Sequence, residues 1–290
     1  MNGIERIAGA FAQTGKRAAL MPYLMGSYPT LEDSIRIGEA CVNAGADIVE
    51  LGMPYSDPLA DGPVIHAAGT EALAAGANVT GILGIARALA ESVPVVLMCY
   101  ANMVMAPGAE AFVERLAKTG ASGLIVPDLP LEESGEIRAA CEAHGLALVP
   151  LVAPTTTPER FAAIGAKAQG FLYTVSVVGT TGERDTAADR GPGPSTSTEQ
   201  SSGEPGASVD RFSEVVARAK ASTAAPVALG FGIGTPEQAL EAAEAGADGV
   251  IVGTRLVRAA GEESEIGQRD PAGAVGAVVG ELAAGLAIAR

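Results

Sequence analysis

Two carboxylic acids, Glu50 and Asp61, are the side chains best placed in the sequence to exchange protons with a substrate. Glu50 belongs to the apolar run of residues 48–51, where burial raises the pKa of a carboxyl group because its charged form loses hydration. Asp61 belongs to the loop of residues 52–63, which contains two glycines and three prolines. Two carboxyl groups that face one pocket suit general acid–base chemistry. The structural alternatives are a buried salt bridge or a hydrogen bond to a neighbouring strand for Glu50, and a helix cap for Asp61.

Glycine-rich segments form a second chemical signal. They occupy residues 179–182, 230–234 and 253–254, and each follows an apolar run. Such turns bind phosphate through backbone N–H groups and the N-termini of helices. We therefore predict a phosphate site at these segments, with turn formation alone as the alternative.

Other kinds of catalysis lack suitable residues in this sequence. The four lysines lie away from the ends of the apolar runs, which disfavours a Schiff-base mechanism. The two histidines, His66 and His144, are far apart and lack the spacing of zinc ligands, so no metal site is predicted. With Schiff-base and metal catalysis disfavoured, we predict acid–base catalysis by carboxyl groups on a phosphorylated substrate.

The elements that must position these residues alternate regularly along the chain. Short aliphatic runs, typical of buried parallel strands, are separated by alanine-rich helical stretches, several of which end at glycine. Eight runs are predicted as strands: residues 20–24, 48–51, 95–100, 124–127, 147–151, 171–175, 227–230 and 250–252. Eight alternating units in 290 residues predict an α/β fold, a TIM (β/α)8 barrel, over a doubly wound sheet. In such a barrel, the catalytic residues lie at the carboxyl ends of the strands.

One segment interrupts this alternation after the sixth predicted strand. Residues 183–208 are mostly glycine, proline, serine, threonine and charged residues, with little to bury. We predict a flexible, disordered insert within a single domain that spans residues 1–290, rather than a linker between two domains.

The composition of the chain indicates which binding partners and which cellular compartment to expect. A net charge of -15 and a pI near 4.6 disfavour nucleic acid as a partner. Three widely spaced cysteines form no disulfide framework, which favours the reducing cytoplasm. The N-terminus shows no apolar signal region. The longest uncharged run, residues 92–109, contains two prolines and an asparagine and is typical of a strand and loop rather than a membrane span.

The segment that contains both acids resembles a known family signature. Residues 50–63 read Glu-Leu-Gly-Met-Pro-Tyr-Ser-Asp-Pro-Leu-Ala-Asp-Gly-Pro, which is similar almost position for position to the α subunit of tryptophan synthase. The resemblance extends over nearly the whole chain outside residues 183–208, with further matches at residues 100–102, 126–130, 230–233 and 253–254. It implies a TIM barrel that cleaves indole-3-glycerol phosphate into indole and glyceraldehyde 3-phosphate, without a metal or organic cofactor in this chain.

The resemblance also implies roles for individual residues. Glu50 and Asp61 correspond to the catalytic pair. The positions that line the substrate pocket are Tyr23, Met98, Tyr100, Val152, Tyr173 and Thr181. The phosphate-binding positions are Gly182, Gly232, Gly253 and Thr254. Asp57 and Asp128 are candidates for coupling to a partner subunit.

That partner is implied to be a β subunit that uses pyridoxal phosphate (PLP) to join indole to serine in an αββα heterotetramer. A stand-alone indole-3-glycerol-phosphate lyase and a mainly allosteric partner subunit are the alternatives. Another phosphate-binding barrel of the same pathway would need a lysine at a strand end, which this chain lacks. No nucleic acid or membrane partner is expected.

Overall fold

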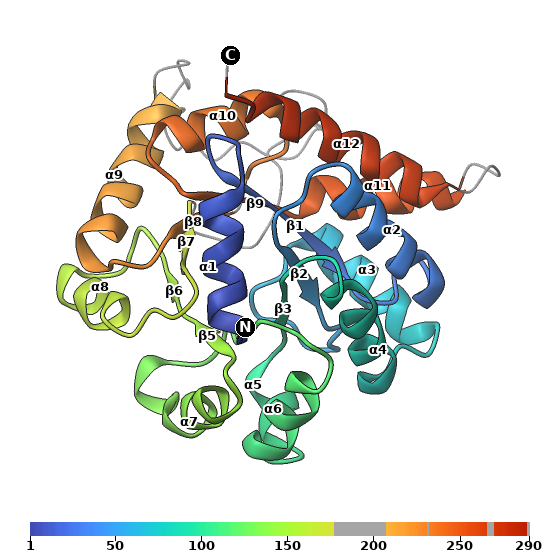
Figure 1. The fold of residues 1–290 in the computed structure, drawn as a ribbon. Helices are drawn as coiled ribbons and strands as arrows, with labels where there is room; N and C mark the ends of the chain where they lie inside the picture. Colours follow the sequence, from blue (N-terminus) through green and yellow to red (C-terminus); the bar gives the residue numbers. More distant parts are fainter. Residues whose placement is uncertain (177–206, 231, 266–269, 289–290) are drawn as a thin grey trace, which may run out of the picture.

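The chain forms a barrel of parallel strands that is surrounded by helices (Figure 1). This computed structural model describes residues 1–176, 207–230, 232–265 and 270–288. The strands are β1 (Ala19–Met25), β2 (Val49–Gly52), β3 (Val95–Met98), β4 (Gly123–Ile125), β5 (Ala147–Val149), β6 (Leu151–Val152), β7 (Leu172–Val175), β8 (Val227–Gly230) and β9 (Gly249–Val252). The predicted TIM barrel is confirmed.

The prediction of one strand over residues 147–151 is wrong in detail, because the structure divides it at Pro150. The neighbour order is β5-β4-β3-β2-β1-β9-β8-β7-β6, so β5 and β6 lie at the two ends. Proline has no N–H for the strand ladder, which interrupts the pairing at that residue. The Pro150 carbonyl still accepts a hydrogen bond from the Tyr173 N–H at 3.0 Å. β5 and β6 are therefore two halves of one strand through which the barrel closes.

Helices cover the outside of the barrel and one of its ends (Figure 1). The described helices are α1 (Gly3–Gln13), α2 (Leu31–Asn43), α3 (Pro63–Ala74), α4 (Val79–Ala90), α5 (Ala101–Met105), α6 (Ala109–Ala117), the 3-10 turn η1 (Leu131–Glu133), α7 (Gly135–His144), α8 (Pro158–Gly165), α9 (Ala207–Ser222), α10 (Pro236–Glu244), α11 (Thr254–Glu265) and α12 (Pro271–Gly285). The Arg6 guanidinium of α1 donates to the carbonyl groups of Ala90 and Gly120, which precede β3 and β4. Helix α1 therefore closes the amino-terminal end of the barrel and leaves the carboxyl end for the site.

Side chains alternate between the inside and the outside of the barrel, as the two-residue period of a strand requires. On β2, Val49 and Leu51 belong to the apolar layer between strands and helices, whereas the preceding Ile48 belongs to the cluster inside the barrel. Glu50 follows Ile48 on the inward side, so its carboxyl group points into the barrel. Tyr23 lies opposite Glu50 in the β1–β2 register.

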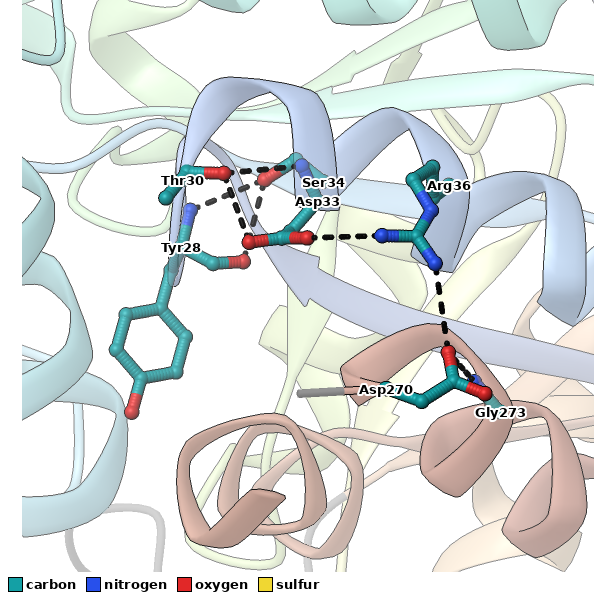
Figure 2. A network of polar contacts seen from close by, with 7 residues as sticks. All are labelled: Tyr28, Thr30, Asp33, Ser34, Arg36, Asp270 and Gly273. Carbon is teal, nitrogen blue, oxygen red and sulfur yellow. Dashed lines mark hydrogen bonds and ion pairs between the residues drawn. The ribbon is translucent and has the colours of Figure 1, made fainter. Parts of the chain in front are cut away.

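Polar contacts join the loop after β1 to helix α2, and α2 to the start of α12 (Figure 2). The Ser34 hydroxyl accepts from the Tyr28 N–H at 3.0 Å and donates to the Tyr28 carbonyl at 3.2 Å. Arg36 lies 3.5 Å from both Asp33 and Asp270, and Asp270 caps α12. These contacts position a loop at the carboxyl end of the barrel.

Two other predictions concern the predicted insert and the uncharged run. Helix α9 begins at Ala207, so the last two residues of the predicted 183–208 insert are helical, and the rest lies outside the described residues. The uncharged run forms strand β3, as predicted, but the short helix α5 occupies part of the predicted loop, so the prediction of a loop alone is wrong. Among the described residues, no single helix is long and apolar enough to cross a membrane.

Ser27, in the loop after β1, offers a test of local strain. Its φ angle of 62° lies in the left-handed region, and its buried hydroxyl has no hydrogen-bond partner among the described residues. We expect Ser27→Gly to raise the free energy of unfolding by about 1 kcal/mol, because glycine adopts this conformation without steric cost and no hydroxyl stays buried. Urea denaturation measures the change. Ser27→Ala, which keeps the Cβ atom, should raise the free energy of unfolding by less. A Ser27→Gly variant that unfolds more easily than the wild type would contradict this account.

Candidate active site

A cavity that is open to solvent at its mouth lies at the carboxyl ends of the strands. Inward side chains of β1, β2, β3 and β7 meet there with the loops that follow β2, β8 and β9. Its lining is Tyr23, Glu50, Ala60, Asp61, Ile65, Met98, Pro127, Leu151, Tyr173, Gly232, Ile233, Ile251, Gly253 and Thr254. The structure thus brings together both predicted acids and most of the predicted pocket and phosphate residues.

Glu50 is a buried carboxyl group on the wall of this cavity. It is 1% exposed, and neither of its carboxyl oxygens has a hydrogen-bond partner among the described residues. Burial raises the pKa of Glu50 to about 8, because the charged form is poorly solvated there. The described residues include no ion pair for Glu50, so the structural alternative for this residue finds no support in them. Near neutral pH, Glu50 is therefore mainly a protonated acid that can donate a proton.

Two tyrosines flank Glu50 inside the barrel. Burial and then the charges of Asp61 and Glu50 raise the pKa of the Tyr23 hydroxyl. Burial and then the charge of Glu50 raise the pKa of the Tyr173 hydroxyl. Both phenols therefore stay neutral across the physiological range and can donate hydrogen bonds into the cavity.

Glycines at the ends of neighbouring strands make room for these two rings. A Cβ atom on Gly52 would lie 2.1 Å from the Tyr23 hydroxyl oxygen, and one on Gly230 would lie 2.6 Å from the Tyr173 hydroxyl oxygen. Since real Cβ contacts are longer than this, any larger residue at either position must displace the tyrosine. The glycine at each strand end thus permits a tyrosine beside it.

Asp61 is a half-buried carboxyl group that also lines the cavity, in the loop between β2 and α3. The Tyr100 hydroxyl donates a hydrogen bond to Asp61 Oδ1 at 3.1 Å. Burial raises the pKa of Asp61, while this hydrogen bond and nearby His66 lower it. Helix α3 begins after Gly62 without a side-chain cap, so the helix-cap alternative for Asp61 is wrong. Its carboxylate is free to face the cavity.

The predicted phosphate residues lie on one side of the same cavity. Gly253 immediately precedes α11, whose first residue is Thr254, so the N-terminus of this helix lies at the cavity wall. Gly232, with a φ angle of 76°, lies in the loop between β8 and α10. Exposed backbone N–H groups at a helix N-terminus favour an anion. Gly182, the fourth predicted phosphate residue, and Thr181 lie outside the described residues.

Four other predicted residues lie away from the cavity wall. Val152 lines a neighbouring cavity between the loops after β4 and β6. Tyr100 touches the site through Asp61 rather than as part of the lining. Asp57 is exposed and accepts from the Ser56 hydroxyl at 2.5 Å, and Asp128 accepts from the Ala101 N–H at 2.9 Å.

Sequence reasoning missed several apolar residues of the cavity lining: Ala60, Ile65, Pro127, Leu151, Ile233 and Ile251. Ala60 lies in the loop with Asp61, Ile65 lies on the helix that follows this loop, and the other four lie at or just beyond predicted strand ends. Position near a strand end is the signal that could have found those four. Together they form an apolar slot beside the two acids. The described residues contain no group of three side chains that could hold a metal ion.

Comparisons with known proteins agree with this geometry. The sequence profile of the tryptophan synthase alpha chain matches residues 10–192 and 196–284. The chain is 44% identical over 254 residues to the tryptophan synthase alpha chain of Methanosarcina mazei, covering 88% of this chain and 85% of that one. It is 46% identical over 244 residues to that of Synechococcus sp. CC9902, covering 83% of each.

Solved structures give the same result. Mycobacterium tuberculosis tryptophan synthase superposes with a TM-score of 0.83 at 36% identity, covering 98% of this chain and 99% of that one. Tryptophan synthase subunit alpha from Legionella pneumophila superposes with a TM-score of 0.81 at 32% identity, covering 99% and 98%. A profile match over most of the chain and relatives above 40% identity establish the family, and the chain belongs to the tryptophan synthase alpha chain family.

Proposed function

We propose that Glu50 and Asp61 carry out the lyase reaction of this family, the cleavage of indole-3-glycerol phosphate into indole and glyceraldehyde 3-phosphate. The observation that carries the proposal is the position of Glu50, which is buried on the cavity wall and has no hydrogen-bond partner among the described residues. A carboxyl group with a pKa near 8 is protonated at the start of the reaction and ionised after one transfer.

The cleavage needs two proton transfers around one carbon–carbon bond. A proton is first added to C3 of the indole ring, which interrupts its aromatic system and leaves positive charge at the ring nitrogen. The glycerol hydroxyl next to the bond then loses its proton and becomes the aldehyde. The electron pair of the breaking bond returns to the ring and restores indole. Glu50 gives the first proton and receives the second, so it ends in its starting state.

Asp61 stabilises the charge that develops during this sequence. As a carboxylate it accepts the indole N–H, and that interaction becomes stronger as the ring nitrogen becomes positive. The apolar slot that includes Ile65 and Leu151 suits the indole ring, and Tyr173 orients Glu50 and the glycerol chain. Gly232, Gly253 and Thr254 bind the phosphate through backbone N–H groups and a hydroxyl, which suits an acidic protein that must bind an anion.

The family implies a β-subunit partner for this chain. We propose an αββα heterotetramer in which indole passes to a β subunit that carries PLP, with Asp57 and Asp128 near the contact. Cleavage itself requires only proton transfers, so we propose that this chain works without a cofactor. A cytoplasmic location agrees with three cysteines that are all buried and free.

The proposal is tested by incubating the purified chain with indole-3-glycerol phosphate and measuring indole and glyceraldehyde 3-phosphate by chromatography. We expect equal amounts of both products, formed slowly by the chain alone and at least about tenfold faster with a β subunit, because closure around the substrate excludes water and completes the site. No indole from either sample would contradict the assigned reaction. Equal rates with and without β would favour the stand-alone lyase.

A further inference from the structure

The Tyr100 side chain connects the end of β3 to the loop that carries Asp61. Its hydroxyl accepts a hydrogen bond from the Ala60 N–H at 3.0 Å and donates one to Asp61 Oδ1 at 3.1 Å. The ring is 4% exposed, and its centroid lies 5.0 Å from that of Tyr55 in the same loop. One buried hydroxyl therefore fixes both the backbone before Asp61 and the carboxylate itself.

Tyr100 also lies at the start of helix α5. Its backbone occupies the N-cap position, yet its side chain makes no capping hydrogen bond. Residues with a short side-chain acceptor are preferred at that position, and tyrosine has none. Asp128, in the loop after β4, instead bonds the first N–H of the helix: its Oδ1 accepts from the Ala101 N–H at 2.9 Å.

These contacts form one continuous connection from the loop after β4 to the catalytic cavity. Asp128 holds the start of α5, the start of α5 includes Tyr100, and the Tyr100 hydroxyl holds Asp61. We propose that Tyr100 is a positioning residue for Asp61 and that Asp128 acts on Asp61 through it. This inference rests on the role proposed above for Asp61, and it gives Asp128 a function within the chain as well as at a subunit contact.

The groups that face Asp61 come from three directions. Tyr100 lies just after β3, His66 lies on α3 and Tyr23 lies on β1. The charge of Glu50, on β2, also raises the pKa of Tyr23. Burial raises the pKa of Asp61, and the Tyr100 hydroxyl lowers it by stabilising the carboxylate. Loss of this hydroxyl should therefore both loosen the carboxylate and raise the pH below which it becomes protonated.

The first test compares Tyr100→Phe with Tyr55→Phe, which removes a hydroxyl from the neighbouring ring. We expect Tyr100→Phe to lower kcat for indole release about tenfold or more, with KM changed less than about threefold, since the carboxylate acts mainly in the transition state. The acid limb of its kcat/KM profile should move to higher pH. Tyr55→Phe should match the wild type within about twofold. A Tyr100→Phe variant with the activity and pH profile of Tyr55→Phe would overturn the proposal.

The second test asks whether Tyr100 acts through Asp61. In an Asp61→Asn background, Tyr100→Phe should lower kcat for indole release less than about twofold. If Tyr100 acts only through the Asp61 carboxylate, its hydroxyl has little left to contribute once that carboxylate is gone. The same loss in both backgrounds would show an independent role and overturn the proposal. A wild-type chain that releases no indole would instead contradict the proposed function, so the two failures are distinguishable.

The third test concerns Asp128, whose replacement leaves the buried Tyr100 ring in place. Asp128→Asn keeps an oxygen acceptor for the Ala101 N–H and should retain at least about half of the activity, whereas Asp128→Ala should reproduce the loss and the pH shift of Tyr100→Phe. The chain is assayed without a β subunit, so that a subunit contact does not enter the result. Equal activity of the two Asp128 variants would contradict the connection.

Discussion

Replacement of Glu50 by glutamine is expected to lower kcat for indole release about 1,000-fold or more, because an amide can neither give a proton to C3 of indole nor take one from the glycerol hydroxyl. Glutamine has nearly the same shape, so KM should change little. Rapid-quench single-turnover measurements at saturating substrate separate the chemical step from product release. A variant that kept more than about a tenth of the wild-type rate would show that another group transfers the protons.

The same substitution should stabilise the fold at neutral and higher pH. The pKa of Glu50 is about 8 in the folded chain and close to 4.5 when exposed, so the folded state holds an extra proton between these values. Folding therefore becomes less favourable as pH rises from 4.5 towards 8, by about 3 kcal/mol at pH 7. Glutamine has no proton to lose and avoids this cost.

Urea denaturation at pH 5 and pH 8 measures this effect. We expect Glu50→Gln to be more stable than the wild type by about 4 kcal/mol at pH 8 and by less than about 1 kcal/mol at pH 5. The same difference at both pH values would show that burial of the charge is not its source. Loss of activity together with a gain in stability is the signature of a group that is buried for catalysis.

Replacement of Asp61 by asparagine is the second large effect. We expect kcat to fall about 100- to 1,000-fold, because a neutral amide cannot stabilise the positive charge that develops at the indole nitrogen. Asparagine keeps the Oδ1 acceptor for the Tyr100 hydroxyl, so the loop should stay in place. Steady-state kcat and KM measure the loss.

A matched control lies on the following helix. Glu71→Gln makes the same change from carboxyl to amide at an exposed position of α3 and should keep the wild-type rate. If Asp61→Asn left KM unchanged and lowered kcat less than about threefold, the claim that Asp61 stabilises the charge on the indole nitrogen would be wrong. The role of Asp61 would then be limited to the shape of the loop.

The orientation of Glu50 could be predicted from the sequence because it depends on local alternation. Residues 48 and 50 share one face of a strand whatever the rest of the chain does, and one face of a barrel strand points inward. The positions of Gly232, Gly253 and Thr254 at the cavity could be predicted in the same way, since each of them follows a predicted strand. The predicted meeting of these segments followed from the barrel itself, where all carboxyl ends share one edge.

The role of Tyr100 could not be predicted in the same way. Its hydroxyl reaches Asp61 only because β2 and β3 are neighbours in a particular register and because α5 turns away at Tyr100. Sequence spacing contains neither fact. The alternative role of Asp61 as a helix cap could not be excluded from the sequence for the same reason, since its carboxylate accepts a hydrogen bond from the distant Tyr100 hydroxyl. Pro150 is visible in the sequence, but the effect of its missing N–H depends on which strands lie beside it, and the fold alone determines that.

The protonation state of Glu50 is the central claim, and a titration of its side-chain carboxyl carbon tests it most directly. Carbon-13 NMR of the chain with labelled glutamate, compared with Glu50→Gln to assign the signal, follows this one group. We predict that the Glu50 carboxyl titrates near pH 8, as its burial requires, and that the rate of indole release falls as pH rises through the same value. A carboxyl signal that titrates near pH 4.5, with a rate that stays constant to pH 9 and beyond, would contradict the account.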